Sequence, residues 1–242
     1  MANSQSAENR TVEPIVLENI VLYGMDGKPA VIYKRLELDG EVVHRRDGGE
    51  YLVKSQNKCE TYFYTCNDGR RLPTLPEIYA IIERLHETRN PALKGIVNDL
   101  NTRELCTGTE IEYSKNRILH RGVVSVKCSI PTGGRNYWLD EAVKKKVRHP
   151  HKATKIQKDA VQALLMCKDV KNAVTVLHEA SGKRPSLGTP WTESRRDIPS
   201  SEVWLYAGAD SFIFDCNCCD DLNGTYIHFR GVRANFIPQL KH

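Results

Sequence analysis

The sequence has no apolar run long enough to cross a membrane and none of the common catalytic motifs. A spanning helix needs roughly 18 or more apolar residues, and no such run occurs. The polar N-terminus, MANSQSAENRTVEP, has no apolar centre of the kind found in signal peptides. The motifs GxSxG, HExxH and GxGxxG and the P-loop are also missing. We therefore expect a non-enzymatic protein that is made in the cytoplasm and does not span a membrane.

The chain carries only a small excess of positive charge. The net charge of +5 is mild for 242 residues, and acidic and basic residues are interspersed, so we expect no nucleic-acid partner. The most basic segment, residues 144–152, has few aromatic neighbours on which bases could stack. We interpret it as a solvated loop, because its His149 and His151 have no Cys or carboxylate at ligand spacing.

The eight cysteines lack the pattern of a closed zinc site. Cys216, Cys218 and Cys219 are crowded together, and the second cysteine pair that usually completes such a site is missing. The chain also lacks a secretion signal, so we expect free, mostly buried thiols, no metal and no cofactor. A cysteine-cluster metal protein or oxidoreductase remains as an alternative from another class.

Hydrophobic periodicity and turn residues predict an α+β fold. Thr74 and Glu77 form a potential capping box before an apolar face that begins at Leu75. Glycine at position 182 is placed to end a later helix. The expected elements are strands in residues 15–54, helices at 75–88, 91–100, 154–167 and 170–177, a hairpin at 109–119, and strands at 123–129 and 200–205.

The stretch from Leu205 to Arg230, LYAGADSFIFDCNCCDDLNGTYIHFR, has an unusual composition. It contains no Lys, Glu, Gln, Met or Trp, the five residue types that codons of the form NNC cannot encode. A template of AAC codons randomised at its adenines would produce this composition. The pattern favours neither a helix nor a long half-buried strand, and a cysteine-rich polar loop is the simpler explanation.

Three short islands resemble a known family. They are GRRLPTLPEIYAI (Gly69 to Ile81), PWTES (Pro190 to Ser194) with the following Glu202-Val203-Trp204, and FRGVR (Phe229 to Arg233). In this order they resemble C-type-lectin-like domains of the formylglycine-generating-enzyme type. An FRGVR ending after a stretch of variable appearance further resembles the variable proteins of diversity-generating retroelements, which include phage tropism determinants and archaeal viral relatives.

The resemblance implies a C-type-lectin-like domain, with two main helices around a twisted antiparallel sheet, at residues 51–242. The variable region would span about 187–235. The resemblance does not cover residues 1–50, where the polar N-terminus and the turn residues predict an arm and a small separate β module. Arg230 and Arg233 would be structural, Trp191 and Trp204 would fill the core, and Phe214, Leu222 and Phe229 would point inward. The fixed cysteine pair that serves oxidation in formylglycine-generating enzymes is not matched here.

The expected function is hypervariable binding of a protein or cell-surface receptor by a protein displayed on a virion tail or cell surface. Random side chains are tolerated only on a rigid, solvent-facing surface, since core substitutions commonly cost a few kcal/mol. A fixed-sequence lectin-like adhesion domain is a further alternative. No catalytic or metal-binding residues are assigned. The expected ligand-binding residues are Tyr206, Asp210, Ser211, Phe212, Ile213, Asp215, Cys216, Asn217, Cys218, Cys219, Asp221, Asn223, Thr225, Tyr226 and His228.

Overall fold

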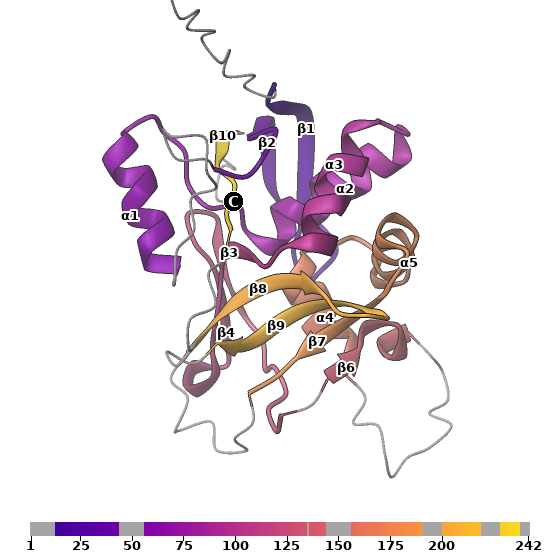
Figure 1. The fold of residues 1–242 in the computed structure, drawn as a ribbon. Helices are drawn as coiled ribbons and strands as arrows, with labels where there is room; N and C mark the ends of the chain where they lie inside the picture. The colour runs from indigo at the N-terminus through magenta and orange to yellow at the C-terminus, as the bar shows by residue number, and fades with distance from the viewer. Residues whose placement is uncertain are drawn as a thin grey trace, which may run out of the picture.

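The fold was analysed in a computed structural model, which describes residues 13–43, 56–134, 136–143, 156–190, 200–218 and 228–237. These residues form a mixed α+β structure (Figure 1). In chain order the elements are β1 (Ile15–Tyr23), β2 (Pro29–Leu38), α1 (Gln56–Cys66), α2 (Leu75–Glu87), α3 (Ala92–Thr102), β3 (Leu105–Glu112), the 3-10 turn η1 (Tyr113–Lys115), β4 (Arg117–His120), β5 (Val124–Lys127), β6 (Asn136–Trp138), the 3-10 turn η2 (Leu139–Val143), α4 (Lys158–Leu165), α5 (Val170–Ser181), β7 (Arg184–Gly188), β8 (Ser201–Ala207), β9 (Ser211–Cys218) and β10 (Val232–Ile237).

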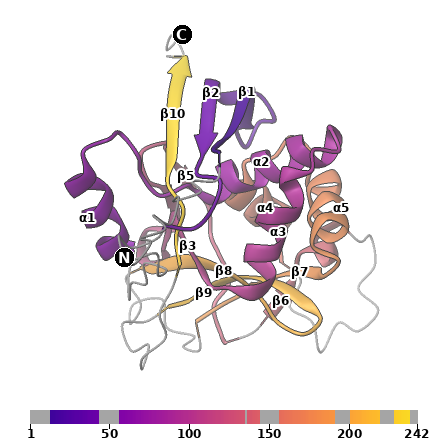
Figure 2. The ribbon, with the colours of Figure 1, turned by 45° about the horizontal axis from the view of Figure 1, so that its top comes forward.

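The strands form two sheets. A seven-stranded sheet has the order β5-β4-β3-β8-β9-β7-β6, and a three-stranded sheet has the order β1-β2-β10. Helices α2, α3, α4 and α5 gather on one side of the molecule, and α1 stands on the other (Figure 2). The larger sheet is mixed rather than antiparallel, because β7 and β9 run parallel. This corrects the expected antiparallel sheet. The described residues contain five α-helices, of which the sequence predicted four.

The predicted capping box starts α2 and is part of a buried ionic network. Thr74 adopts an extended conformation at the N-cap, and the Glu77 carboxylate accepts hydrogen bonds from the Thr74 amide at 2.8 Å and from Arg71. The Tyr33 hydroxyl donates a further hydrogen bond to Glu77 at 2.6 Å. Burial opposes the charged form of Glu77, but these partners outweigh it and hold the pKa of Glu77 below its ordinary value. The network therefore ties β2 to the start of α2.

A buried histidine makes a second link between elements. The Nε2 of His120 lies 3.0 Å from the carbonyl oxygen of Ala163, which can only accept, so Nε2 carries the proton and Nδ1 accepts from the Thr109 hydroxyl. The Thr109 oxygen in turn accepts from the Leu75 amide at 2.9 Å. Burial lowers the pKa of His120 to about 4. The neutral ring therefore joins β4, β3, α4 and the first turn of α2.

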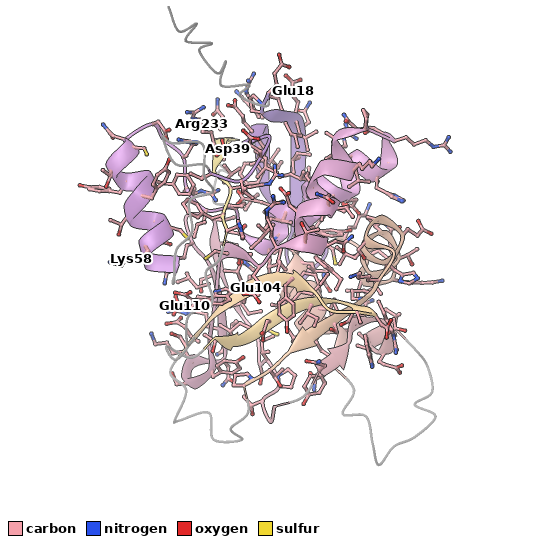
Figure 3. The ribbon with its side chains drawn as sticks, in the orientation of Figure 1. Glu18, Asp39, Lys58, Glu104, Glu110 and Arg233 are labelled. Carbon is pink, nitrogen blue, oxygen red and sulfur yellow. The ribbon has the colours of Figure 1, made fainter. Side chains whose placement is uncertain are left out.

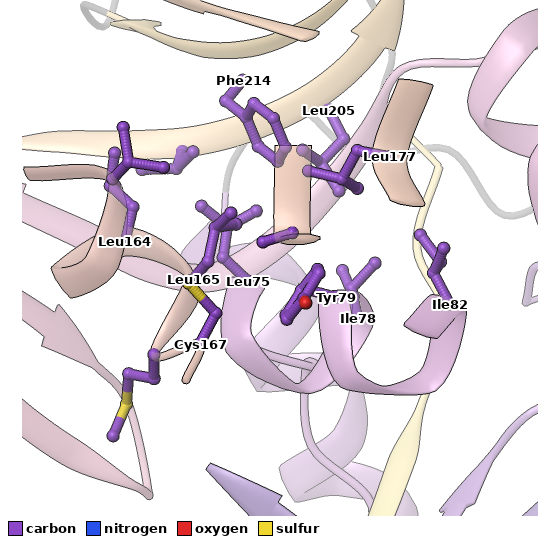
Figure 4. Close-up of a cluster of buried hydrophobic side chains, with 14 of the residues drawn as sticks. Leu75, Ile78, Tyr79, Ile82, Leu164, Leu165, Cys167, Leu177, Leu205 and Phe214 are labelled. Atoms are coloured by element: carbon purple, nitrogen blue, oxygen red, sulfur yellow. The ribbon is translucent and has the colours of Figure 1, made fainter. Parts of the chain in front are cut away.

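One apolar core joins helices α2 to α5 to both sheets. Figure 4 shows side chains from α2, α4, α5, β8 and β9 in contact within it. Ile20, Leu22 and Leu36 of the N-terminal hairpin belong to the same core. The hairpin also pairs with β10 through β2. The expected division at residue 50 therefore separates parts of the chain that share one sheet and one core.

Asp39, at the end of β2, holds the C-terminal FRGVR segment. Its carboxylate accepts from the Gly231 amide at 2.8 Å and from Arg70 at 3.0 Å. Its carbonyl oxygen accepts from Arg230 at 2.6 Å, and Arg230 also pairs with the buried Asp99 of α3. Arg233 donates to the carbonyl oxygen of Asp68 at 3.0 Å, and Figure 3 shows Asp39 and Arg233 close to β10. The structural roles predicted for Arg230 and Arg233 are confirmed.

The other predicted elements have mixed outcomes. The hairpin at 109–119 and the helices near 75, 91, 154 and 170 are confirmed, as is the end of α5 at Gly182, where φ is 67°. Helix α1 was not predicted, because its sequence QNKCETYFYTC has no clear apolar stripe at helical spacing; of its residues 58–66, only Cys59 and Phe63 are buried. Residues 41–43 form no strand, and residues 44–55, where further strands were expected, lie outside the described part. The described helices include none long and apolar enough to span a membrane.

Gly231 and Gly95 make a matched pair for testing the Asp39 clamp. A Cβ at Gly231 would lie 2.5 Å from the Asp39 carboxylate, 2.8 Å from Arg70 and 2.9 Å from Phe63. We expect Gly231→Ala to lower the free energy of unfolding by about 1–3 kcal/mol, because the surrounding groups must move. Gly95 lies in α3 with nothing near its missing Cβ. Gly95→Ala should therefore raise stability by about 0.5–1 kcal/mol. Urea denaturation measures both, and equal effects would contradict the clamp.

Glu77 should make a pH-dependent contribution to stability. We expect Glu77→Gln to cost about 3 kcal/mol at neutral pH, because it leaves the Arg71 guanidinium without its buried partner. Since the folded-state pKa of Glu77 lies below its ordinary value, this contribution is present above the unfolded-state pKa of about 4.3 and is lost as the pH falls through the folded-state pKa. The control is Glu87→Gln, an exposed position at the end of the same helix. Urea denaturation at neutral and acidic pH measures the free energy of unfolding of each variant. The difference in this free energy between wild type and Glu77→Gln should become smaller in acid.

Candidate ligand-binding surface

Strand β9, which contains seven of the fifteen expected binding residues, lies inside the seven-stranded sheet. It pairs antiparallel with β8 and parallel with β7. Its alternate residues Phe212, Phe214 and Cys216 belong to the core. The rings of Phe212 and Phe214 meet edge to face with their centroids 5.1 Å apart. One side of this strand is therefore fixed by packing.

Three of the expected ligand-binding residues are buried, which corrects their assignment to the exposed surface. Phe212 is 1% exposed, Ile213 6% and Cys216 0%. Phe212 and Cys216 point inward because side chains alternate along a strand that has neighbours on both edges. Ile213 lies on the opposite face and is flanked by Ser186 of β7 and Tyr206 of β8. The inward positions predicted for Phe214 and Phe229 and the core position predicted for Trp204 are confirmed.

The outward face of β6, β7, β9 and β8 carries two rows of side chains. Strand pairing aligns Trp138, Ser186, Ile213 and Tyr206 in one row. It aligns Asn136, Gly188, Asp215 and Trp204 in the next row. Trp204 marks one boundary, because it packs with Cys106, Phe229 and α1 residues in a second apolar cluster. We call the part formed by Asn136, Trp138, Ser186, Gly188, Tyr206, Ser211, Ile213 and Asp215 the outward face.

Gly188 forms the floor of the outward face. A Cβ at this position would lie 2.9 Å from Asp215 Oδ1 and 3.3 Å from Asn136 Oδ1. Ordinary side chains do not fit at such distances, so glycine permits the two oxygens to approach the same point above β7. Asp215 is half-buried and Asn136 is exposed.

Charged groups border the outward face. The Arg184 guanidinium contacts Asp140 at 2.7 Å and Glu141 at 2.9 Å, and it lies 4.2 Å from the centroid of the Trp138 ring. Glu104 lies where β3 begins (Figure 3). Burial raises the pKa of Glu104, the charge of Asp215 raises it further, and His228 lowers it. Glu104 and Asp215 are therefore two interacting carboxylates at the side of the outward face that is nearest to the start of β3.

The remaining expected residues divide into described and undescribed groups. Asp210 is exposed, and Tyr206, Ser211 and His228 are half-buried. The His228 backbone pairs with Glu104 and Cys106, at 2.9 Å in both hydrogen bonds. For Asn217 and Cys218 only the backbone within β9 is described. Outside the described residues lie Trp191, Cys219, Asp221, Leu222, Asn223, Thr225, Tyr226 and the basic loop at 144–152.

The geometry of Cys216 does not favour a metal or redox site. Burial raises the pKa of the Cys216 thiol well above its ordinary value, so it stays protonated, and a protonated thiol is a poor nucleophile and a poor ligand. Within the described ranges no group of three or more His, Cys, Asp or Glu side chains is arranged to hold a metal ion. The side chains of Cys218 and Cys219 are not part of those ranges.

A cavity of about 410 Å³ beside β10 is a weaker candidate site. Its lining includes Glu37, Asp39, Tyr62, Arg70 and Arg233. Arg70 pairs with Asp39 at 3.0 Å, and Arg233 pairs with Glu37 at 3.1 Å. These charges serve the attachment of β10 to β2, so they are better explained as structural.

The sequence did not predict the residues that β6 and β7 contribute to the outward face. Asn136, Trp138, Ser186 and Gly188 are far from β9 in sequence, and no local motif marks them. Alternation of polar and apolar residues in Arg184–Gly188 was the available signal. It was too short to show that β7 pairs with β9.

Comparison of the chain with protein-family models, with curated proteins and with solved structures yields no match.

Two positions on opposite sides of β9 allow a direct test of its two faces. We expect Cys216→Ser to lower the free energy of unfolding by about 1–3 kcal/mol, because it places a hydroxyl in the apolar core. Ser211→Cys exchanges the same two groups at a half-buried position on the outward side, and it should alter stability by no more than about 0.5 kcal/mol. Urea denaturation monitored by tryptophan fluorescence measures both. A larger loss for Ser211→Cys would contradict the assignment of faces.

Proposed function

We propose that this chain is a C-type-lectin-like protein whose outward face and adjoining C-terminal residues bind a protein or cell-surface receptor. In this proposal the chain is the variable protein of a diversity-generating retroelement, and adenine-directed mutagenesis changes the exposed positions. The protein is displayed on a virion tail or a cell surface. It performs no catalysis and binds with preformed side chains.

The division of β9 into a packed and an outward side is the observation that carries the proposal. Phe212, Phe214 and Cys216 anchor the strand in the core, while Ser211 and Asp215 lie on the other side. A change at the half-buried Ser211 or Asp215 removes little packing, whereas a change in the core or at the buried Ile213 commonly costs a few kcal/mol. Such a strand can present different side chains without loss of the fold.

The attachment of the C-terminal strand gives the second support. The FRGVR segment is held by Asp39 and Asp99, and β10 pairs with β2 in the three-stranded sheet. The chain on both sides of residues 219–227 is therefore anchored to rigid elements. Binding surfaces are commonly built from loops that a rigid scaffold supports in this way.

The composition of the surface is suited to recognition. Tyr206 offers a large contact area with few rotatable bonds, and Ser211, Asp210 and Asn136 offer adaptable hydrogen bonds, as in antibody paratopes. Neither a catalytic pair nor a metal site is needed for this function. The cysteine-based alternative is less well supported, because Cys216 lies inside the core.

Sequencing the 3′ ends of sibling genes tests the proposal. We expect substitutions to gather at Tyr206, Ser211 and Asp215 and in residues 219–227, with changes at adenines of a nearby AAC-rich template. Phe212, Phe214, Cys216, Trp204 and Gly231 should stay unchanged, because each is packed. The control segment is α2, which should not vary. Evenly spread substitutions would contradict diversification, and a constant surface would favour the fixed-sequence adhesion domain.

A further inference from the structure

Helix α1 carries the most exposed aromatic side chain of the described residues. Tyr64 is 86% exposed, whereas the other exposed large apolar side chains, Met25 and Val16, are 40% and 39% exposed. The helix itself is anchored on another side, because Cys59 and Phe63 are buried. Figures 1 and 2 both show α1 apart from the other helices. The Tyr64 ring is therefore presented to the surroundings by a packed helix.

A cavity of about 350 Å³ lies directly beside Tyr64 and combines apolar with guanidinium groups. Its lining consists of Glu60, Phe63, Tyr64, Arg70, Arg71, Leu72, Gly108, Arg121 and Gly122. The side chains of Arg71 and Arg121 are 25% and 29% exposed, so both can be reached from outside. A group that enters this cavity therefore meets apolar surface and guanidinium groups together.

Carboxylates fix and neutralise the guanidinium groups of the cavity. Arg121 donates to Glu60 at 2.8 Å and to Glu110 at 2.7 Å. Arg71 donates to Glu77 at 2.8 Å. An anionic ligand would be repelled by these carboxylates, so it would gain little here. A neutral aromatic ring is attracted to a guanidinium group without competing for its carboxylate partner.

Contacts of the kind that an aromatic side chain would make already occur in this protein. The Arg70 guanidinium lies 5.6 Å from the centroid of the Phe63 ring in the wall of the cavity. The hydroxyls of Tyr33 and Tyr79 each donate a hydrogen bond to a glutamate. The Glu60 carboxylate, 37% exposed, is such an acceptor at the cavity. A tyrosine ring therefore suits both the apolar and the polar part of the lining.

The chain itself carries such a ring at the rim of the cavity. Because Tyr64 is 86% exposed, it does not fill the cavity of its own copy. A two-fold axis that passes midway between the ring and the cavity would bring each ring to the cavity of the other copy. Contacts of this isologous type are the commonest in protein oligomers. The presence of ring and cavity on one patch therefore favours a second copy of this chain as the occupant.

We propose that two copies of this chain associate through α1, each placing its Tyr64 ring in the cavity of the other. The dimer is weak rather than obligate, because one ring and one small cavity from each copy form the centre of the contact. No residue that lines the cavity belongs to the outward face, so the inference goes beyond the proposed function and stands without it. Two joined copies would present two outward faces and so bind a repeated receptor with higher avidity.

Sedimentation equilibrium of the full chain over a range of concentrations tests the inference. A reducing agent is included, because Cys66 is an exposed free cysteine. We expect the average mass to rise with concentration from that of one chain toward that of a dimer. Tyr64→Ser should weaken association about tenfold or more, because it removes both rings from the contact. Tyr64→Phe keeps the rings and should retain most of the association, and the control Met25→Ser should leave it unchanged.

A photocrosslink from position 64 locates the contact. Tyr64→p-benzoylphenylalanine keeps an aromatic ring and joins covalently to adjacent groups on irradiation. In a mixture of isotope-labelled and unlabelled protein, we expect crosslinks between copies from position 64 to residues 60–63, 70–72 or 121–122. Near-ultraviolet circular dichroism checks that each variant is folded, and the high exposure of Tyr64 makes a large loss of stability unexpected.

Three results would overturn the inference. The first is a mass that stays at that of one chain at every concentration. The second is equal weakening by Tyr64→Ser and Met25→Ser, and the third is crosslinking between copies only at other parts of the chain. Saturable binding of N-acetyl-L-tyrosinamide by a protein that stays single would assign the cavity to another partner and reject self-association. All these results leave the proposed receptor binding intact, because sibling genes test it separately.

Discussion

The clamp around Asp39 is the interaction on which the arrangement of the molecule depends. The Asp39 carboxylate, just after the end of β2, accepts hydrogen bonds from the Gly231 amide and from Arg70. The Asp39 carbonyl oxygen accepts a hydrogen bond from Arg230. Hydrogen bonds to a charged acceptor are stronger than those between neutral groups. Because Gly231 has no room for a side chain, the approach is close and specific. The N-terminal hairpin, β1 and β2, is thereby joined to β10 in the three-stranded sheet.

The attachment of β10 to β2 helps to fix the position of the seven-stranded sheet. Once β10 is attached to β2 and the core is filled by α2, α4 and α5, the seven-stranded sheet has a fixed inner face. On its outward face Asn136 is exposed and Tyr206 and Ser211 are half-buried, so these positions can carry polar and aromatic groups at low cost in stability, whereas Ser186 and Ile213 are buried. The proposed binding function uses this division of the sheet into a packed face and an outward one. It requires neither a moving part nor a cofactor.

The structure changes how the unusual C-terminal stretch is understood. Its sequence pattern favours neither a helix nor a long half-buried strand, yet residues 211–218 form an interior strand of the larger sheet whose aromatic residues belong to the core. Its NNC-compatible composition does not conflict with this arrangement, since Phe and Ile are as accessible to such codons as Asp and Ser. Under the proposed function, variation is therefore tolerated at alternate positions of β9 rather than along its whole length.

The sequence by itself determined the elements that local chemistry specifies. Thr74 and Glu77 mark the start of α2, the apolar spacing marks its buried face, and Gly182 marks the end of α5, because capping and periodicity act within a few residues. Only the tertiary structure decided which side of β9 is buried, that β7 runs beside it, and that Asn136 meets Asp215 above Gly188. These contacts join residues that are distant in the chain, and pairing between strands leaves no local signal in either partner.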